Sequence, residues 1–269
     1  MSMPPDFINE IAQFTLKVCT PLCWHDRKAL FPKPVNGASC FVLRFPDRLV
    51  GITAAHVVAA YDEARQTIPN FVCQLRMMEF RLHEAIIDCD DHLDIATFGL
   101  SEDELKKIDG LAIDCRGDWP PPEPQKNRAL SWAGLPNLGR TTSVDKSAVF
   151  QAYGALPMVE DFTEQDIWTT YDPQRDNAFG GTPKPPLGLN ISGCSGGPAL
   201  MHGERNGLHR WFPVGFIVAG PRRDQPEPVD HGAIADIETI CIRRVHVVKE
   251  DGSIKRNEYQ TGGWLPGQA

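Results

Sequence analysis

Hydrophobic positions near the start of the chain repeat with the period of an α-helix. The apolar side chains that share one helical face are Phe7, Ile8, Ile11, Phe14 and Val18. Asp6, which follows two prolines, is a typical N-cap residue, so the pattern predicts a helix over residues 6–18. We expect this helix to pack across the rest of the fold; a docking or regulatory helix is the alternative.

From Asn36 onward the pattern changes to short apolar runs that are typical of β-strands. Runs at residues 40–45 and 49–53 flank Pro46-Asp47-Arg48, which predicts a hairpin that ends just before His56. The same criterion predicts further strands at residues 71–80, 81–87, 149–153, 167–171 and 211–220.

Two segments between these runs have distinct local signatures. Ser101 begins a predicted short helix, in which Glu104 completes a capping box and Gly110 follows the end. Residues 118–124 have the sequence Asp-Trp-Pro-Pro-Pro-Glu-Pro, which fits no central strand or helix and therefore predicts a linker. The residues after Arg243 are mixed in charge and are expected to form a solvated terminal segment.

The composition is that of an ordinary globular protein and argues against several classes. Of the 269 residues, 42% are hydrophobic and 23% are charged, and the net charge of −8 comes without a Lys/Arg block, which disfavours a nucleic-acid binder. No apolar run approaches the ~18 residues of a membrane span. The first residues lack the features of a secretory signal, so the chain, if complete, is expected in the cytoplasm. Its eight cysteines are then expected to be reduced and mostly buried.

The strongest chemical signal is the sequence Gly193-Cys194-Ser195-Gly196-Gly197-Pro198. A hydroxyl residue between glycines suits a nucleophile on a tight turn, where backbone N–H groups are free to face a reacting carbonyl. Earlier in the chain, His56 follows Thr53-Ala54-Ala55, and Asp94 lies within Leu93-Asp94-Ile95-Ala96. This set fits a serine nucleophile, its general base and an orienting carboxylate.

With these three motifs in this order, the chain resembles the chymotrypsin/trypsin-like serine endopeptidases, and among them the bacterial HtrA-type branch. The resemblance covers roughly residues 35 to 245. It implies an all-β fold of two antiparallel β-barrels, with an N-terminal helix and a C-terminal helix or tail. Residues 233–240 resemble the last strand and the start of the C-terminal helix. The corresponding parts are an N-terminal helical extension, the first barrel, a Pro-rich linker, the second barrel and a C-terminal tail, at residues 1–34, 35–117, 118–127, 128–245 and 246–269.

The resemblance also implies a role for each catalytic residue. Ser195 is the expected nucleophile, His56 the general base and Asp94 the carboxylate that orients it, while the backbone N–H groups of Gly193 and Ser195 are the expected oxyanion hole. Of the four aspartates at 88, 90, 91 and 94, only Asp94 matches the motif. The other three are expected in a solvated loop, and a calcium loop is a weaker alternative.

Substrate selection is expected to depend on a pocket beside the nucleophile. By its position in the family motif, Leu189 lies at the base of this pocket, with Val218, Ala219 and Gly220 as its wall. A leucine base favours small or medium apolar residues before the scissile bond. Val218 stands where many relatives have a serine next to the catalytic aspartate. The loss of this serine is expected to weaken catalysis without ending it.

Cys194 raises two further questions. It is a rival nucleophile, although relatives that use cysteine have it in the place of Ser195. It also replaces the aspartate that binds a newly formed N-terminus in secreted relatives, so activity is expected to be constitutive or controlled by loop ordering, oligomerisation or a regulatory protein partner.

The expected function is therefore hydrolysis of protein or peptide substrates by a serine endopeptidase, with no metal or organic cofactor. A pseudo-protease that only binds peptides is the first alternative, and a protease for one dedicated partner is the second. Cys19, Cys23 and His25 are three residue types that bind zinc, but no fourth is evident, so a metal site is disfavoured.

Overall fold

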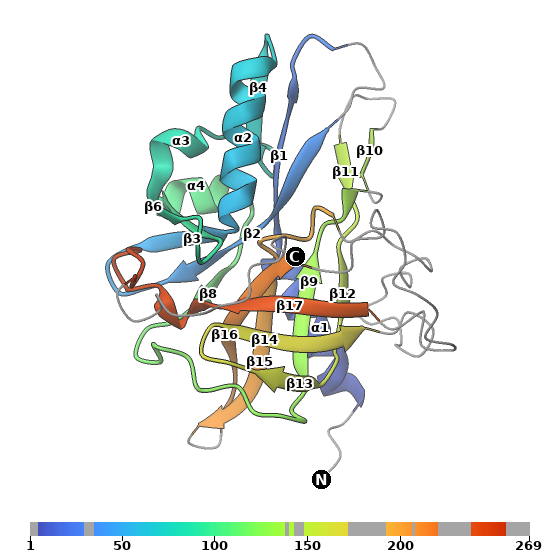
Figure 1. The fold of residues 1–269 in the computed structure, drawn as a ribbon, viewed down its shortest axis with the longest axis vertical. Helices are drawn as coiled ribbons and strands as arrows, with labels where there is room; N and C mark the ends of the chain where they lie inside the picture. The colour runs from blue at the N-terminus through green and yellow to red at the C-terminus, as the bar shows by residue number, and fades with distance from the viewer. Residues whose placement is uncertain are drawn as a thin grey trace.

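Two β-sheets account for most of the protein (Figure 1). The computed structural model describes residues 5–29, 35–137, 140–142, 148–171, 192–205, 208–219 and 238–256. The sheets lie at opposite ends of the molecule in Figure 1, with helix α2 (Ala55–Thr67) beside the first sheet and helix α1 (Pro5–Val18) against the second. The coarse prediction of a mainly β protein is confirmed.

The first sheet, within the described residues, has eight strands in the order β5-β4-β1-β2-β3-β7-β6, with β8 parallel to β2. Their bounds are β1 (Thr20–Asp26), β2 (Asn36–Arg44), β3 (Leu49–Thr53), β4 (Phe71–Leu75), β5 (Met78–Glu79), β6 (Ile86–Asp90), β7 (Ile95–Leu100) and β8 (Ala112–Asp114). The inner strand β3 is buried on both faces along its whole length. Gly51 is needed there, because a Cβ atom would lie 2.2 Å from the Phe98 ring.

The second sheet has seven strands in its described part, in the order β12-β9-β15-β16-β17-β14-β13. Their bounds are β9 (Leu130–Gly134), β12 (Tyr153–Ala155), β13 (Val159–Phe162), β14 (Asp166–Tyr171), β15 (Pro198–Arg205), β16 (Leu208–Ala219) and β17 (Glu238–Arg244). A separate ribbon pairs β10 (Arg140–Thr142) with β11 (Ala148–Phe150). Strand β15 begins at Pro198, three residues after Ser195, so the nucleophile candidate lies just before the long antiparallel hairpin of β15 and β16.

Several elements agree with the sequence predictions. Helix α1 covers the predicted range, and Thr15 on it donates a hydrogen bond to Ser131 of β9. The hairpin β2–β3 forms around Pro46-Asp47-Arg48. Helix α4 (Glu102–Lys107) has the predicted capping box between Ser101 and Glu104.

Several predictions about secondary structure are wrong. Residues 71–80 form two strands, β4 and β5, and the predicted strand at residues 149–153 is interrupted between β11 and β12. The predicted strand at residues 81–87 begins instead as the short helix α3 (Leu82–Ala85), because the Arg81 carbonyl accepts the N–H groups of Glu84 and Ala85 while Leu82 is fully buried. After β17 the described chain forms a 3-10 helix, η2 (Val245–Val247), rather than the α-helix expected near the C-terminus.

The described part of the segment after η2, residues 248–256, is also not a solvated tail. Val248 pairs with Ile254, and both side chains are buried. The segment returns to the first sheet, where Thr97 of β7 donates a hydrogen bond to the Gly252 carbonyl. These long-range contacts explain the error, since the mixed charge of this segment gave no sign of them.

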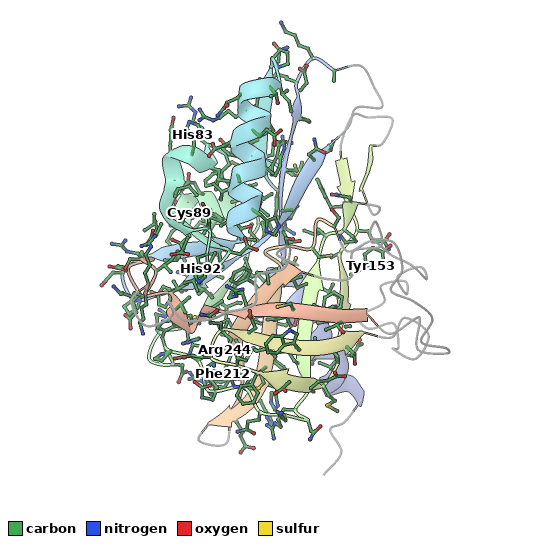
Figure 2. All side chains as sticks on the ribbon, in the orientation of Figure 1. His83, Cys89, His92, Tyr153, Phe212 and Arg244 are labelled. Atoms are coloured by element: carbon green, nitrogen blue, oxygen red, sulfur yellow. The ribbon has the colours of Figure 1, made fainter. Side chains whose placement is uncertain are left out.

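Figure 2 shows the described side chains on the ribbon. Buried side chains from both sheets form one shared hydrophobic core. It contains Phe41 and Phe98 from the first sheet, Phe216 and Val218 from the second, and Val245 from η2. A second cluster around Trp132 and Cys194 lies within the second sheet. All eight cysteines are free, and all but the half-buried Cys89 are buried, as predicted. None of the helices in the described ranges is long and apolar enough to cross a membrane.

Candidate active site

His56 lies in the first turn of α2, three residues beyond the end of β3. The residue before the helix, Ala54, has an extended backbone and no side chain that caps the helix. The Asp94 carboxylate, which is distant in sequence, caps the helix instead. Its Oδ1 accepts the backbone N–H of His56 at 2.9 Å. The imidazole is half exposed, so its outer nitrogen is accessible.

The Asp94 carboxylate also holds the imidazole ring. Its Oδ2 lies 2.8 Å from His56 Nδ1 and its Oδ1 lies 3.0 Å away, with only 24% of the aspartate side chain exposed. A carboxylate at Nδ1 favours a proton there and leaves Nε2 as the basic nitrogen. Asp94 has a φ of +49°, which a non-glycine residue adopts only under local constraint.

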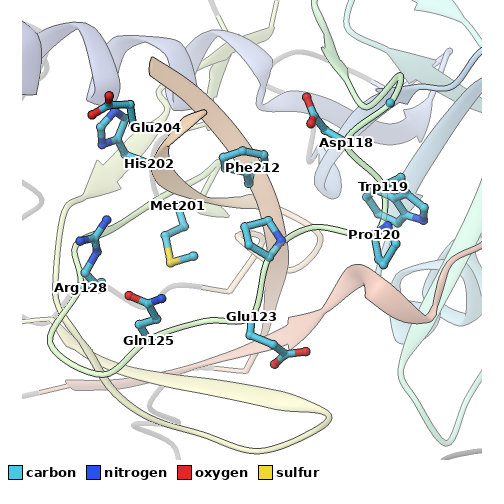
Figure 3. A pocket seen from close by; sticks show the side chains of 13 residues that line it. Asp118, Trp119, Pro120, Glu123, Gln125, Arg128, Met201, His202, Glu204 and Phe212 are labelled. Carbon is cyan, nitrogen blue, oxygen red and sulfur yellow. The ribbon is translucent and has the colours of Figure 1, made fainter. Parts of the chain in front are cut away.

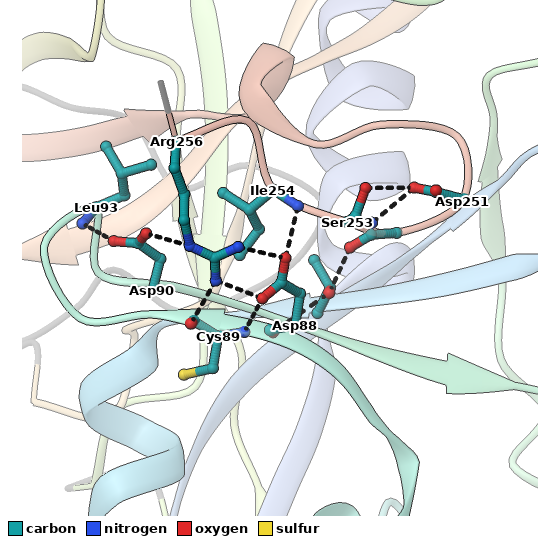
Figure 4. Close-up of polar contacts among 10 residues, drawn as sticks. Asp88, Cys89, Asp90, Leu93, Asp251, Ser253, Ile254 and Arg256 are labelled. Atoms are coloured by element: carbon teal, nitrogen blue, oxygen red, sulfur yellow. Dashed lines mark hydrogen bonds and ion pairs between the residues drawn. The ribbon is translucent and has the colours of Figure 1, made fainter. Parts of the chain in front are cut away.

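Two arginines from distant parts of the chain provide that constraint at Leu93. Arg243 of β17, which is 3% exposed, pairs with Asp166 of β14 at 2.7 Å and donates to the Leu93 carbonyl at 2.5 Å. On the other side, Asp90 accepts the Leu93 N–H at 2.8 Å and pairs with Arg256 at 3.0 Å (Figure 4). Leu93, the residue before Asp94, is therefore held on both sides, its carbonyl by Arg243 of the second sheet and its N–H by Asp90 of the first.

The aspartates near Asp94 do not all form the expected solvated loop. Asp91 is exposed, but the carboxylates of Asp88 and Asp90 are mostly covered and both pair with Arg256 (Figure 4). Burial alone would raise the pKa of Asp88. Hydrogen bonds from Arg256 and from the N–H groups of Ile254 and Cys89 outweigh it and hold that pKa below its usual value.

The turn that carries Ser195 is attached to the first sheet through Ser39 of β2. The Ser39 N–H donates to the Ser195 carbonyl at 3.0 Å, and the Ser39 hydroxyl donates to the Gly193 carbonyl at 2.9 Å. Gly196 follows with a φ of +83°, and a Cβ atom there would lie 2.1 Å from the Ser39 carbonyl oxygen. The close approach between the turn and β2 thus requires this glycine.

The backbone N–H groups of Gly193 and Ser195 donate no hydrogen bond to any residue in the described part of the chain. Gly193 has a φ of +96°. Ser195 lines a cavity of about 470 Å³ together with Gly193 and His56. Among the described residues, however, no hydrogen bond joins the Ser195 hydroxyl to His56.

Cys194 has a different environment from Ser195. Its side chain is 1% exposed and belongs to the core cluster of the second sheet. A Cβ atom added at Gly134 would lie 2.5 Å from the Cys194 Cβ, so β9 packs closely against it. Ser195, not Cys194, lines the cavity that contains His56.

The residues expected to select the substrate are only partly described. Val218 is buried on β16 as part of the shared core, and Ala219 ends the same strand. Leu189 and Gly220 lie outside the described residues.

A second cavity, of about 460 Å³, lies between the linker and the β15–β16 hairpin (Figure 3). Trp119, Arg128, His202 and Phe212 are among the residues that line it, and none of its lining residues is shared with the cavity of His56. The linker is firmly attached here, since Trp119 Nε1 donates to the Val248 carbonyl at 2.9 Å.

Sequence reasoning found His56, Asp94 and Ser195 but missed Arg243 and Arg256. The sequence does contain a sign of the buried Arg243. A pair of arginines directly follows the apolar run Ile240-Cys241-Ile242. A charged side chain in such a run is rarely buried without a partner.

No group of three residues among the described His, Cys, Asp and Glu side chains could hold a metal ion, and this includes Cys19, Cys23 and His25. No family model matches the sequence. No curated protein has a significantly similar sequence.

Proposed function

We propose that the protein is a serine endopeptidase with a chymotrypsin-like fold, in which each large sheet corresponds to one β-barrel. The observation that carries the proposal is the pairing of His56 Nδ1 with the Asp94 carboxylate, at the edge of a cavity that Ser195 also lines. The pairing leaves a basic nitrogen on the cavity side, which a serine nucleophile requires.

In the proposed reaction the Ser195 hydroxyl attacks the carbonyl carbon of a peptide bond. His56 Nε2 takes the hydroxyl proton as the new C–O bond forms, and Asp94 stabilises the resulting imidazolium. His56 then gives the proton to the leaving amine as the C–N bond breaks. Water, activated by the same histidine, hydrolyses the acyl-enzyme ester and regenerates Ser195.

The two amides of the turn that donate to no described residue suit the negative charge that develops in this reaction. The carbonyl oxygen becomes an oxyanion in the tetrahedral intermediate, and the N–H groups of Gly193 and Ser195 are the proposed donors to it. Each such donor is commonly worth about 2.7–4 kcal/mol of transition-state stabilisation. We further propose a preference for small or medium apolar residues before the scissile bond, with Leu189 at the base of that pocket.

A second candidate function is peptide binding without turnover. The observation that favours it is the absence, among the described residues, of a hydrogen bond between the Ser195 hydroxyl and His56. The endopeptidase proposal requires this contact to form when substrate fills the cavity, as catalytic hydrogen bonds commonly tighten in the substrate complex.

Labelling with a fluorophosphonate probe separates the two candidates. We expect the wild-type protein to react and the modified peptide, located by mass spectrometry, to contain Ser195. The Ser195→Ala variant is expected to lose both labelling and peptide hydrolysis, whereas Cys194→Ala keeps most of both because Cys194 faces the core. Labelling that survives in Ser195→Ala but disappears in Cys194→Ala would reverse the assignment, and an unreactive wild-type protein would favour peptide binding.

A further inference from the structure

The helix face that carries His56 continues along the same cavity. The exposed or half-exposed residues of α2 that line it, at helical spacing, are His56, Ala60, Glu63, Ala64 and Thr67. Strands β1 and β2, which run beside α2 in Figure 1, contribute the opposite wall with Trp24, Asn36, Gly37 and Ala38. The cavity is therefore a groove that begins at His56 and follows the helix.

The groove has room for a peptide, and its described lining carries one negative charge, that of Glu63, with no positive charge beside it. Ala60 and Ala64 are small, so the wall beyond His56 is open. Glu63 is the single carboxylate among the described residues that line the cavity, and none of them is Lys or Arg. Glu63 is exposed and forms no ion pair with any described residue.

The groove lies on the leaving-group side of Ser195. Strand β16, which carries the proposed wall of the pocket for the residue before the scissile bond, is bound to the opposite end of the turn. The Gly196 N–H donates to the Ile217 carbonyl at 2.8 Å, and the Ile217 N–H donates to the Gly197 carbonyl at 2.9 Å. No residue of β16 belongs to the described lining of the groove. A substrate that places the residues before the scissile bond against β16 must therefore direct the residues after that bond along α2.

The helix geometry fixes which substrate residue meets Glu63. Glu63 is seven residues after His56, which corresponds to about 10 Å along a helix that rises ~1.5 Å per residue. An extended peptide advances about 3.3 Å per residue, so about three residues cover the same distance. We propose that the groove binds the leaving-group half of an extended substrate and that Glu63 selects Lys or Arg at the third residue after the scissile bond. This inference rests on the proposed endopeptidase function.

The expected preference is modest, because Glu63 is exposed to solvent. An exposed ion pair typically changes an equilibrium by up to about fivefold. We therefore expect kcat/KM to be about threefold to fivefold higher with Lys than with Gln at the third position, and lower again with Glu. The preference should shrink as salt rises from 0.05 to 0.5 M, taken as approximate limits, because ions screen exposed charges.

The test uses internally quenched peptides whose cleavage site has been mapped by mass spectrometry and which differ only in the third residue after that site. Glu63→Gln is expected to remove the difference between Lys and Glu peptides, and Glu63→Lys to invert it. Asp62→Asn is the matched control, since Asp62 lies on the same helix outside the cavity and pairs with Arg65. A preference that is unchanged in Glu63→Gln, or equally weakened in Asp62→Asn, would overturn the inference.

A binding measurement keeps this test independent of turnover. The same peptides are titrated into the Ser195→Ala variant, with and without Glu63→Gln. We expect tighter binding of the Lys peptide by about the same factor, and no difference when Glu63 is replaced. Equal binding of the Lys and Glu peptides to Ser195→Ala overturns the inference even if the wild-type protein is an active protease, whereas peptides that bind selectively but are never cleaved refute only the proposed hydrolysis.

Discussion

At the scale of single residues, Asp94 combines two functions that are usually separate. Its carboxylate accepts the backbone N–H of His56 and contacts Nδ1 of the same residue, so it caps helix α2 and orients the imidazole at once. The position of the ring is therefore coupled to the start of the helix. This coupling accounts for the left-handed backbone at Asp94, since a relaxed extended residue would aim the carboxylate elsewhere.

Replacing Asp94 by asparagine tests this dual role. The amide is nearly the same size but can donate to Nδ1, which would favour the wrong imidazole tautomer. We expect kcat for peptide hydrolysis to fall about 10³- to 10⁴-fold, with a much smaller change in KM. Steady-state kinetics measure the effect, and thermal unfolding of the same variant shows whether the fold is kept. A decrease of less than tenfold would mean that Asp94 does not orient the base.

At the scale of elements, the turn between β6 and β7 depends on both sheets. Arg243 and Asp166 lie on neighbouring strands of the second sheet, and the guanidinium reaches across to the Leu93 carbonyl. Their ion pair is buried, so each charge depends on the other. The arrangement makes Arg243 a positioning residue for Asp94.

A double substitution, Arg243→Met with Asp166→Leu, tests that role without leaving a buried charge unpaired. We expect a folded protein in which the Asp94 turn has lost one anchor, with kcat reduced by about 10- to 100-fold and KM little changed, since small misplacements of catalytic groups are costly. Steady-state kinetics are the readout, because a misaligned base lowers kcat while KM stays nearly the same.

The matched control for that experiment is Arg44→Gln, which removes an ion pair with Glu102; neither residue lines the cavity of His56. It is expected to leave kcat unchanged. If the double variant retains full kcat, Arg243 has only a structural role.

The local elements could be predicted from the sequence, whereas the supports of the site could not. The β2–β3 hairpin and the capping box of α4 depend on residues only a few positions apart, so their signals are visible in the chain. His56 and Ser195 were found because small residues surround them. Arg243 and Arg256 contact residues 150 and 168 positions away, and no local pattern reports such contacts.

At the scale of the whole molecule, the two sheets and the segment after β17 share one core. Val245 and Val247 of η2 are almost fully buried, and the chain beyond them covers part of the first sheet. His246 lies between these valines. Burial, followed by the nearby Arg244, lowers its pKa from 6.5 to about 4. The neutral imidazole is therefore part of the folded state.

This coupling predicts that acid weakens the fold through His246. In the unfolded chain the imidazole takes up a proton near its ordinary pKa of 6.5, but in the folded protein only near pH 4. The unfolded state thus binds more protons between these values, so the free energy of unfolding should fall as the pH is lowered from about 6.5 to 4. We expect a fall of about 1–2 kcal/mol, less than the full shift would give, because solvent screens part of the imidazole. Urea unfolding at a series of pH values measures the slope. His246→Gln should remove most of this slope. The control His92→Gln, which changes an exposed histidine on the β6–β7 turn, should keep it. Equal slopes in wild type and His246→Gln would show that the segment after β17 does not depend on a neutral imidazole.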